Sequence, residues 1–247
     1  MPMVLIAWFR SLVAYLFLCL FIGLIGPPAL LFTLLTGRVR HLFVLGRLGA
    51  MTARRIFGIR VTVDGLEHVQ AGRPTVYCIN HRSNVDVIVF ELILPHCPNL
   101  RALYKAELGR VPILGRVLRA VGFVPVERAQ RDRAIEAVDV AVEHLKAGDS
   151  FLLAPEGTRS RTDRMLPFKK GGFVMAIKAH APVVPIAILG SEQAMPRGRF
   201  YATPGRVIVR IGEPVPTAGM GFADRDRLAA EVRRRMEAML DPTRERS

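Results

Sequence analysis

The chain has 247 residues, 51% of them hydrophobic, which is enough for one domain with a sizeable core plus an appendage. Its formal net charge of +14 implies an anionic partner: nucleic acid, an anionic membrane surface or a phosphorylated substrate. Few aromatic residues interleave with the basic ones, and no zinc-finger spacing or helix-turn-helix signal occurs, which argues against nucleic acid. The three cysteines are scattered and form no C-x-x-C pair, which argues against a disulfide framework.

The first sixty residues contain arginines but no acidic residue, a pattern that suits a bilayer. Residues 11–36 carry no charge and would span about 39 Å as a helix, whereas about 20 apolar residues suffice to cross a bilayer. The proline pair in Gly26-Pro27-Pro28 is expected to break or kink this helix. A re-entrant or interfacial hairpin therefore competes with a single spanning helix, and a cleaved signal peptide is a third alternative, without a convincing cleavage site.

A second helix is predicted beyond the proline pair. Arg40, Arg47 and Arg54 recur every seven residues and so share one helical face, while apolar side chains fill much of the rest. This pattern is typical of an interfacial helix whose arginines meet lipid head groups. We therefore expect residues 1–58 to form an N-terminal apolar, membrane-anchoring helical segment and residues 59–247 to form a separate domain.

Beyond residue 60 the pattern changes to alternating strands and helices. Strands are expected at residues 60–63, 75–79, 151–154, 183–189 and 207–211, and helices at residues 133–146, 172–180 and 225–240. Such alternation predicts an α/β fold with a mixed, partly parallel sheet flanked by helices.

The first candidate site follows the strand expected at residues 75–79, and open α/β sheets bind ligands beyond the carboxyl ends of their strands. His81 lies five residues before Asp86. If the chain turns between them, the carboxylate can hold one imidazole nitrogen while the other accepts a proton from a hydroxyl. Ser83-x-x-Asp86 also matches a capping box, so the alternative is that Asp86 caps a helix over residues 87–94.

The second candidate site follows the strand expected at residues 151–154 and reads Pro-Glu-Gly-Thr-Arg-Ser over residues 155–160. Arg159 can bind a phosphate through two parallel hydrogen bonds, and Thr158 and the backbone at Gly157 can add others. Basic residues follow, and a glycine pair opens a helix whose N-terminal N–H groups favour anions. The alternative is a solvated basic loop.

Two more cations lie between these sites. Lys105 stands alone, whereas Arg128 ends an apolar segment at residues 122–128. Both either line an anion pocket or form surface pairs with Glu107 and Glu127.

Neither a protein nucleophile nor a metal site is predicted. There is no G-x-S-x-G elbow, and Cys78 lies within a strand among apolar residues, as a core residue would. No His, Cys or Asp cluster has metal-ligand spacing. The histidines other than His81 stand alone, and we expect them to be structural or exposed.

In this order, the motifs resemble those of the glycerolipid acyltransferase family. The family's N-H-x-x-x-x-D motif is matched at residues 80–86, and its P-E-G-T-R-S motif at residues 155–160. The apolar segment that ends in Arg is matched at residues 122–128, where Pro125 and Glu127 depart from the family's pattern. A short V-P-apolar strand is matched at residues 184–186.

The resemblance implies that His81 is a general base and Asp86 its orienting partner. It implies that Arg159 and Arg128 bind the acceptor's phosphate, and that Lys105 binds phosphate or stabilises charge at the thioester carbonyl. The implied substrate-binding residues are Lys105, Arg128, Glu156, Gly157, Thr158 and Arg159.

The activity implied is transfer of a fatty acyl group from a thioester to the sn-2 hydroxyl of 1-acyl-glycerol-3-phosphate, forming phosphatidic acid for phospholipid biosynthesis. The thioester of coenzyme A or acyl carrier protein is a co-substrate, and no further cofactor is expected. Membrane lipids and lysophosphatidic acid are the expected partners, at the inner membrane with the active site facing the cytoplasm. The alternatives are another lysolipid acceptor, such as a lyso-aminolipid or lysocardiolipin, and a non-catalytic membrane-binding module.

Overall fold

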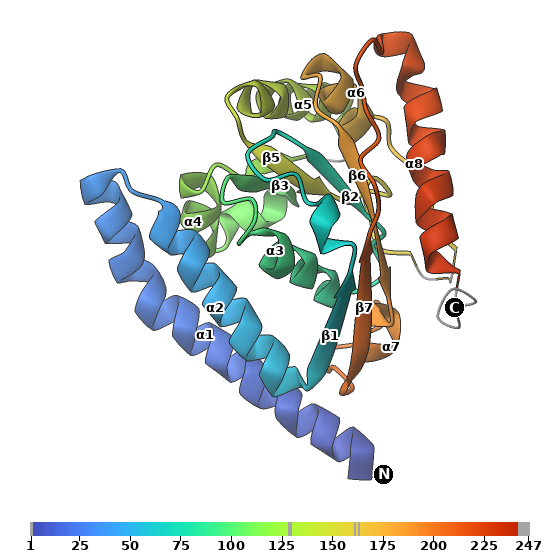
Figure 1. Cartoon of the computed structure of the whole chain (residues 1–247). Coiled ribbons are helices and arrows are strands. Elements are labelled where there is room, and N and C mark those ends of the chain that lie inside the picture. The colour runs from blue at the N-terminus through green and yellow to red at the C-terminus, as the bar shows by residue number, and fades with distance from the viewer. Residues whose placement is uncertain (1, 128–129, 161, 163, 242–247) are drawn as a thin grey trace.

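The chain folds as a helical hairpin packed against an α/β sandwich (Figure 1). The computed structural model describes residues 2–127, 130–160, 162 and 164–241. The hairpin consists of α1 (Pro2–Thr36) and α2 (Arg40–Phe57). The ring of His41 lies 3.1 Å from the Thr33 hydroxyl and 2.9 Å from the Ala29 carbonyl, which joins the two helices near their connection. At the other end, Arg10 donates hydrogen bonds to carbonyls of the last turn of α2.

The proline pair does not end the first helix, so the expected break is wrong. Helix α1 runs through Pro27 and Pro28 to Thr36. Two backbone hydrogen bonds are missing there, but α1 packs against α2 on one side and against Ile113 on another, at Gly26. Among the described residues, α1 is the one helix long and apolar enough to cross a membrane. The turn between α1 and α2 therefore lies at residues 37–39 and not at the proline pair, where the sequence-based hairpin was expected.

Two of the three regularly spaced arginines of α2 bind the protein itself, which corrects their expected role at lipid head groups. Arg54 donates to both carboxylate oxygens of the buried Glu91, at 3.3 and 3.1 Å. Arg47 donates to the Glu91 carbonyl at 3.2 Å. These contacts fasten α2 to α3 (Ile88–Ile93), whereas Arg40 is exposed.

The domain is built on a seven-stranded sheet in the order β1-β7-β6-β2-β5-β3-β4. All neighbouring strands are parallel except β6 and β7. The strands are β1 (Ile59–Asp64), β2 (Val76–Ile79), β3 (Leu100–Lys105), β4 (Val124–Val126), β5 (Ser150–Leu153), β6 (Val183–Leu189) and β7 (Gly205–Ile211). This confirms the predicted α/β fold with a mixed, partly parallel sheet.

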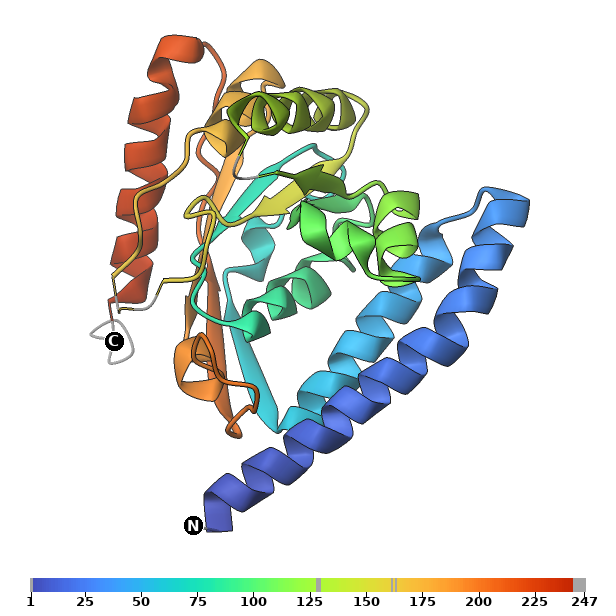
Figure 2. The ribbon, with the colours of Figure 1, turned by 180° about the vertical axis from the view of Figure 1, so that it is seen from behind.

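Helices cover both faces of the sheet (Figures 1 and 2). The hairpin and α3 lie over one face, where alternate strand residues such as Tyr77 and Ile79 are buried. The other face buries Val76 and Cys78 under α5 (Arg131–Lys146), α6 (Gly171–Lys178) and α8 (Arg225–Leu240). Two shorter helices, α4 (Leu114–Ala120) and α7 (Ser191–Ala194), lie near the carboxyl ends of β3 and β6.

The parallel strands β2, β5, β3 and β4 end at one edge of the sheet. The first candidate motif follows β2, and the second follows β5, which is its neighbour. The topology therefore brings the two motifs together although about 70 residues separate them in the chain.

Candidate active site

The turn after β2 places His81 against Asp86. His81 Nδ1 lies 2.8 Å from Asp86 Oδ2, and the same oxygen accepts hydrogen bonds from the backbone N–H groups of Arg82 and Ser83, each at 2.8 Å. The carboxylate is buried, whereas about a quarter of the imidazole side chain, 26%, is exposed. An imidazole protonated on Nδ1 has a bare Nε2, and a nitrogen in that state accepts a proton.

Capping and pairing turn out to be compatible roles of Asp86. The Ser83 hydroxyl accepts a hydrogen bond from Val85 N–H while Asp86 accepts one from Ser83 N–H, which forms the capping box at the start of a 3-10 turn over Asn84–Val87. The Ser83 hydroxyl also donates to the Met195 carbonyl at 2.7 Å. The cap therefore holds the carboxylate that meets His81 in a fixed position.

Asn80 anchors the beginning of this turn. Its side-chain amide donates to the Ile188 carbonyl at 2.9 Å and accepts from Ile188 N–H at 2.7 Å, so it pairs with the backbone of β6 as another strand would. The residue is fully buried. The asparagine before His81 thus fixes where the chain leaves the sheet.

Glu156 joins the second motif to the first. One carboxylate oxygen accepts from His81 N–H at 2.8 Å and the other accepts from Leu166 N–H at 2.7 Å. In return, Ser160 N–H donates to the His81 carbonyl at 2.8 Å. Burial raises the pKa of the Glu156 carboxyl, although the two backbone hydrogen bonds act to lower it. The backbone of His81 is therefore held on both sides by the second motif.

Arg159 reaches the first motif through its side chain. Its Nη1 donates to Asn84 Oδ1 at 2.7 Å, and Asn84 stands between His81 and Asp86 in the chain. Arg197 donates from its guanidinium to the Arg159 carbonyl at 2.7 Å. A guanidinium is thus held beside the His–Asp pair, in a partly exposed position open to an anion.

The remaining residues expected to bind substrate are Gly157, Thr158, Lys105 and Arg128. Gly157 has φ +69°, a left-handed conformation that favours glycine in this turn. Thr158 is exposed, and its side chain makes no hydrogen bond within the part of the chain that the structure describes. Lys105 ends β3 at the same sheet edge, but its ammonium pairs with Glu107 at 3.0 Å. Arg128 lies outside the described residues.

A large apolar cavity of about 530 Å³ adjoins this turn. It lies between the hairpin, α3 and α4, and Asn84 and Val85 of the first motif line it. Its floor carries the ion pair of Arg54 and Glu91. Its lining is otherwise mostly apolar, as suits a hydrocarbon chain.

The sequence profile of the Acyltransferase family matches residues 60–189, which include both motifs. The chain belongs to the acyltransferase family.

Named members of this family resemble the chain over most of its length. It is 33% identical to 1-acyl-sn-glycerol-3-phosphate acyltransferase alpha of Ovis aries over 77% of this chain, and 33% identical to the Mus musculus protein of the same name over 77%. The matched stretches cover 66% and 67% of those relatives, so the chain spans about two thirds of their length. The crystal structure of the 1-acyl-sn-glycerophosphate (LPA) acyltransferase PlsC from Thermotoga maritima superposes with a TM-score of 0.77 and 28% identity, covering 94% of this chain and 95% of that one.

Sequence reasoning missed two residues of this acyltransferase site. Asn84 occupies a variable position of the N-H-x-x-x-x-D motif, and Arg197 belongs to a basic loop after α7. Both are identified only by their contacts with Arg159, since 75 and 38 residues separate them from it in the chain. No local pattern in the sequence marks either contact.

Proposed function

We propose that the protein transfers a fatty acyl group from an acyl thioester to the sn-2 hydroxyl of 1-acyl-glycerol-3-phosphate, forming phosphatidic acid. Membership of the acyltransferase family and the similarity to named 1-acyl-sn-glycerol-3-phosphate acyltransferases support this activity. The observation that carries it is the shared turn in which His81 meets Asp86 while Asn84 meets Arg159.

His81 acts as the general base. Its Nε2 takes the proton of the acceptor hydroxyl as that oxygen attacks the thioester carbonyl carbon. Asp86 keeps the other proton on Nδ1 and stabilises the imidazolium that forms. The carbon–sulfur bond then breaks, and the leaving thiolate takes the proton from the imidazolium. The chain therefore needs no acyl-enzyme intermediate, and the proposal invokes no cofactor beyond the thioester.

The acceptor's phosphate binds at Arg159. A guanidinium forms two charge-assisted hydrogen bonds with a phosphate, which fixes both the position and the orientation of the acceptor. Asn84 holds this guanidinium before the acceptor arrives, and Glu156 and Gly157 shape the loop that presents it. Arg128 and Lys105 stay candidates for the same phosphate or for the thioester carbonyl.

The apolar cavity accommodates an acyl chain beside this site. It begins at Asn84 and Val85 and extends under the hairpin. A hydrocarbon chain there would leave water for a mostly apolar lining, and such burial is favourable. Since the hairpin forms the cavity's roof and α1 exposes large apolar side chains along its outer face, a lipid can enter without crossing bulk water. We place the protein on the inner membrane, with its site facing the cytoplasm.

The test is a donor-by-acceptor assay with purified protein in vesicles and mass detection of the lipid product. We expect phosphatidic acid from lysophosphatidic acid, with either acyl-coenzyme A or acyl carrier protein as donor, and no product from monoacylglycerol, which lacks the phosphate. Equal turnover of monoacylglycerol would contradict the phosphate assignment. Faster acylation of a lyso-aminolipid or lysocardiolipin than of lysophosphatidic acid would identify that lipid as the acceptor instead. Absence of thioester cleavage with every acceptor would favour a non-catalytic membrane module.

A further inference from the structure

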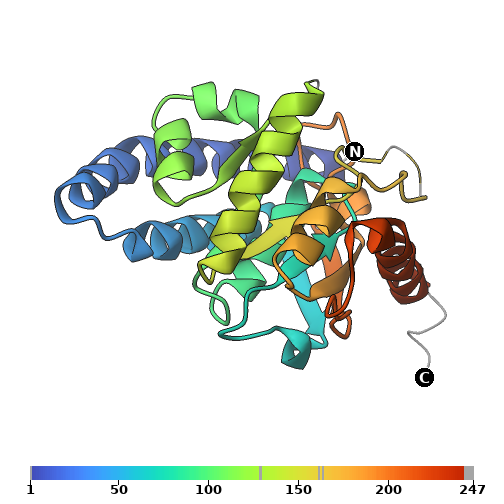
Figure 3. The ribbon, with the colours of Figure 1, turned by 90° about the horizontal axis from the view of Figure 1, so that it is seen from above.

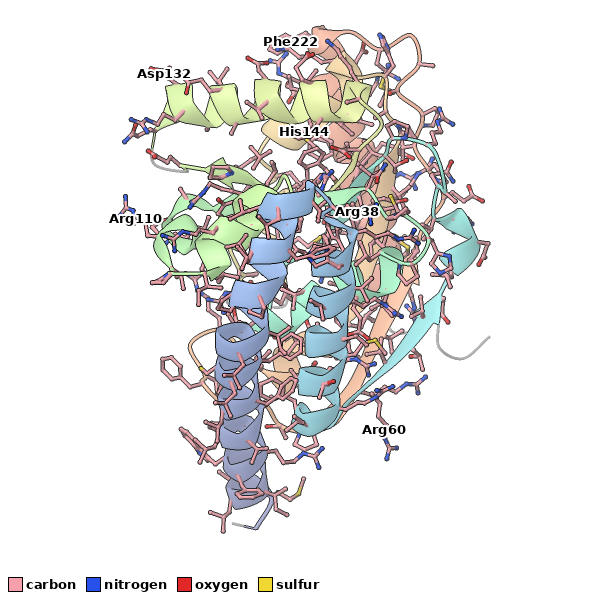
Figure 4. The ribbon with its side chains drawn as sticks, turned by 90° about the vertical axis from the view of Figure 1, so that its left-hand side faces the viewer. Arg38, Arg60, Arg110, Asp132, His144 and Phe222 are labelled. Atoms are coloured by element: carbon pink, nitrogen blue, oxygen red, sulfur yellow. The ribbon has the colours of Figure 1, made fainter. Side chains whose placement is uncertain are left out.

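The segment between β3 and β4 lies against the hairpin on the side of α1 opposite α2 (Figure 3). It comprises a 3-10 turn, η3 (Ala106–Arg110), and helix α4. Ile113 joins it to α1, because a Cβ added at Gly26 would lie only 2.8 Å from Ile113 Cγ2. Figure 4, which faces the hairpin, shows Arg110 of this segment and Arg38 of the hairpin on opposite sides of α1.

Ile113 is held in an unusual backbone conformation. Its φ and ψ are 64° and −61°, and Leu114 N–H donates to the Pro112 carbonyl at 2.6 Å, which is a γ-turn of the rare positive-φ type. A β-branched residue adopts such a conformation only where its surroundings impose it. The turn directs Ile113 toward α1 and the apolar cavity, which it lines.

Two other apolar side chains of this segment are exposed to solvent. Leu108 is 44% exposed and Val111 is 43% exposed. Neighbouring positions are basic: residues 105–120 contain Lys105, Arg110, Arg116 and Arg119 but a single acid, Glu107. Exposed apolar side chains within a basic surface are typical of segments that lie at a membrane interface.

Exposed apolar side chains next to basic residues also occur on the hairpin. The outer face of α1 is strongly apolar, with large exposed side chains at Leu24, Leu31, Leu34 and Leu35 among others. On the α2 side, the connection between the helices carries the exposed Arg38, and α2 itself carries the exposed Arg40 and Arg55. The segment between β3 and β4 supplies a matching cationic border on the other side. An apolar ridge between two rows of cations complements a bilayer whose head groups are anionic.

We propose that residues 106–119 form a second membrane-contacting element, which places Leu108 and Val111 among the lipid head groups and acyl chains of an anionic bilayer. The inference rests on the proposed membrane function, and it adds a second membrane contact to the one made by the hairpin. One helix in an interface can roll about its axis, whereas contacts on both sides of α1 fix the rotation. Leu114 and Val117 of the same segment line the apolar cavity, so the contact also brings the cavity next to the lipid.

The first test uses tryptophan fluorescence with brominated lipids. Trp8 is the sole tryptophan, lies in α1 and is 51% exposed, so the unmodified chain reports whether the hairpin meets the lipid. In a Trp8→Phe background, Leu108→Trp should be quenched by brominated phosphatidylglycerol vesicles. The control Val140→Trp, at an exposed position of α5 on the other side of the sheet, should not be quenched.

The outcomes separate the two proposals. Quenching of Trp8 without quenching at position 108 would overturn the second contact and leave the membrane function standing. Quenching of neither reporter would overturn both. Equal quenching at positions 108 and 140 would mean that the protein binds vesicles without a defined face, which also contradicts the inference.

The second test changes charge. Arg110→Glu/Arg116→Glu should sediment with phosphatidylglycerol vesicles at least about 10-fold more weakly, because each cation near an anionic surface contributes roughly a fivefold effect. The control Arg227→Glu/Arg234→Glu, at exposed sites of α8, should bind as the unmodified chain does. Unchanged sedimentation of the Arg110/Arg116 variant would overturn the proposal.

Discussion

Within the described residues there are two His–Asp pairs with the same spacing in the chain and the same distance between the paired atoms. His144 Nδ1 lies 2.8 Å from Asp149 Oδ2, as His81 Nδ1 lies 2.8 Å from Asp86 Oδ2, and each aspartate follows its histidine by five residues. His144 does not stand alone, contrary to the sequence-based expectation. The pairs occupy opposite edges of the sheet, because Asp86 follows the end of β2 whereas Asp149 precedes the beginning of β5 (Figure 4 labels His144).

Their surroundings differ in the groups that meet the carboxylate. Asp149 is paired with the guanidinium of Arg101, whose Nε and Nη2 lie 3.1 and 3.2 Å from its two oxygens. Asp86 instead meets the backbone N–H groups of Arg82 and Ser83. A guanidinium neutralises a carboxylate, so Asp149 already has a cationic partner besides its imidazole. The comparison teaches that spacing gives the pair, while the sheet edge and the neighbouring charge decide what it can do.

The largest expected difference between the two His–Asp pairs is in kcat, when each aspartate is replaced by asparagine. In Asp86→Asn the amide cannot stabilise the imidazolium, so we expect kcat to fall at least about 100-fold. Asp149→Asn should leave kcat near the wild-type value. Steady-state assays of both variants, with circular dichroism to establish that each is folded, make the comparison. A similar loss of kcat in both variants would contradict the different roles assigned to the two pairs.

Arg159→Ala should have the next largest effect. Loss of a charge-assisted hydrogen-bonding partner typically costs about 1.5–3 kcal/mol, so KM for lysophosphatidic acid should rise roughly 10- to 100-fold while KM for the thioester changes little. Arg101→Ala is the matched control, since its guanidinium also meets the turn of a His–Asp pair. A rise confined to the thioester KM would contradict the assignment.

Arg101→Ala should act on stability instead. Removing it leaves the largely buried Asp149 without its guanidinium partner, and we expect the free energy of unfolding to fall by about 1–3 kcal/mol. Denaturant titration measures this loss, and the vesicle assay should find kcat close to that of the wild type. A large loss of kcat with unchanged stability would give the second pair a catalytic role.

Glu156→Gln should have the smallest effect, and one that depends on pH. Because the pKa of Glu156 is raised in the folded chain, its contribution to stability is fully present below the ordinary glutamate pKa and is lost as pH rises through the raised value. The stability of the wild type relative to Glu156→Gln should therefore decrease with rising pH over that window. Denaturant midpoints measured across it provide the check, and an opposite slope would contradict the assigned burial.

Much of the fold is readable from the sequence because its elements are locally patterned. The strand at residues 183–189 and the helix at residues 225–240 have the predicted bounds, and the others agree within a few residues. Strands β3 and β4 were both missed. Strand β4 has only three residues, including Pro125, which lacks the N–H that a central strand needs. It lies at the sheet edge, where proline is tolerated.

The site was only partly predictable, for a different reason. The motifs identified His81, Asp86 and Arg159, because their spacing and order are contained in short stretches of chain. The contacts that position them are long-range: Glu156 accepts from His81 N–H across 75 residues, and Arg159 donates to Asn84 across 75. Such contacts depend on the order of strands in the sheet, which no local pattern reveals.

The most direct measurement compares kcat of His81→Ala and His144→Ala in the same vesicle assay. The first variant removes the imidazole at the carboxyl edge of the sheet, and the second removes its twin at the other edge. We predict a loss of at least about 100-fold for His81→Ala and turnover near wild type for His144→Ala, with both variants folded. Near-normal turnover by His81→Ala would contradict the assignment of that residue as the base.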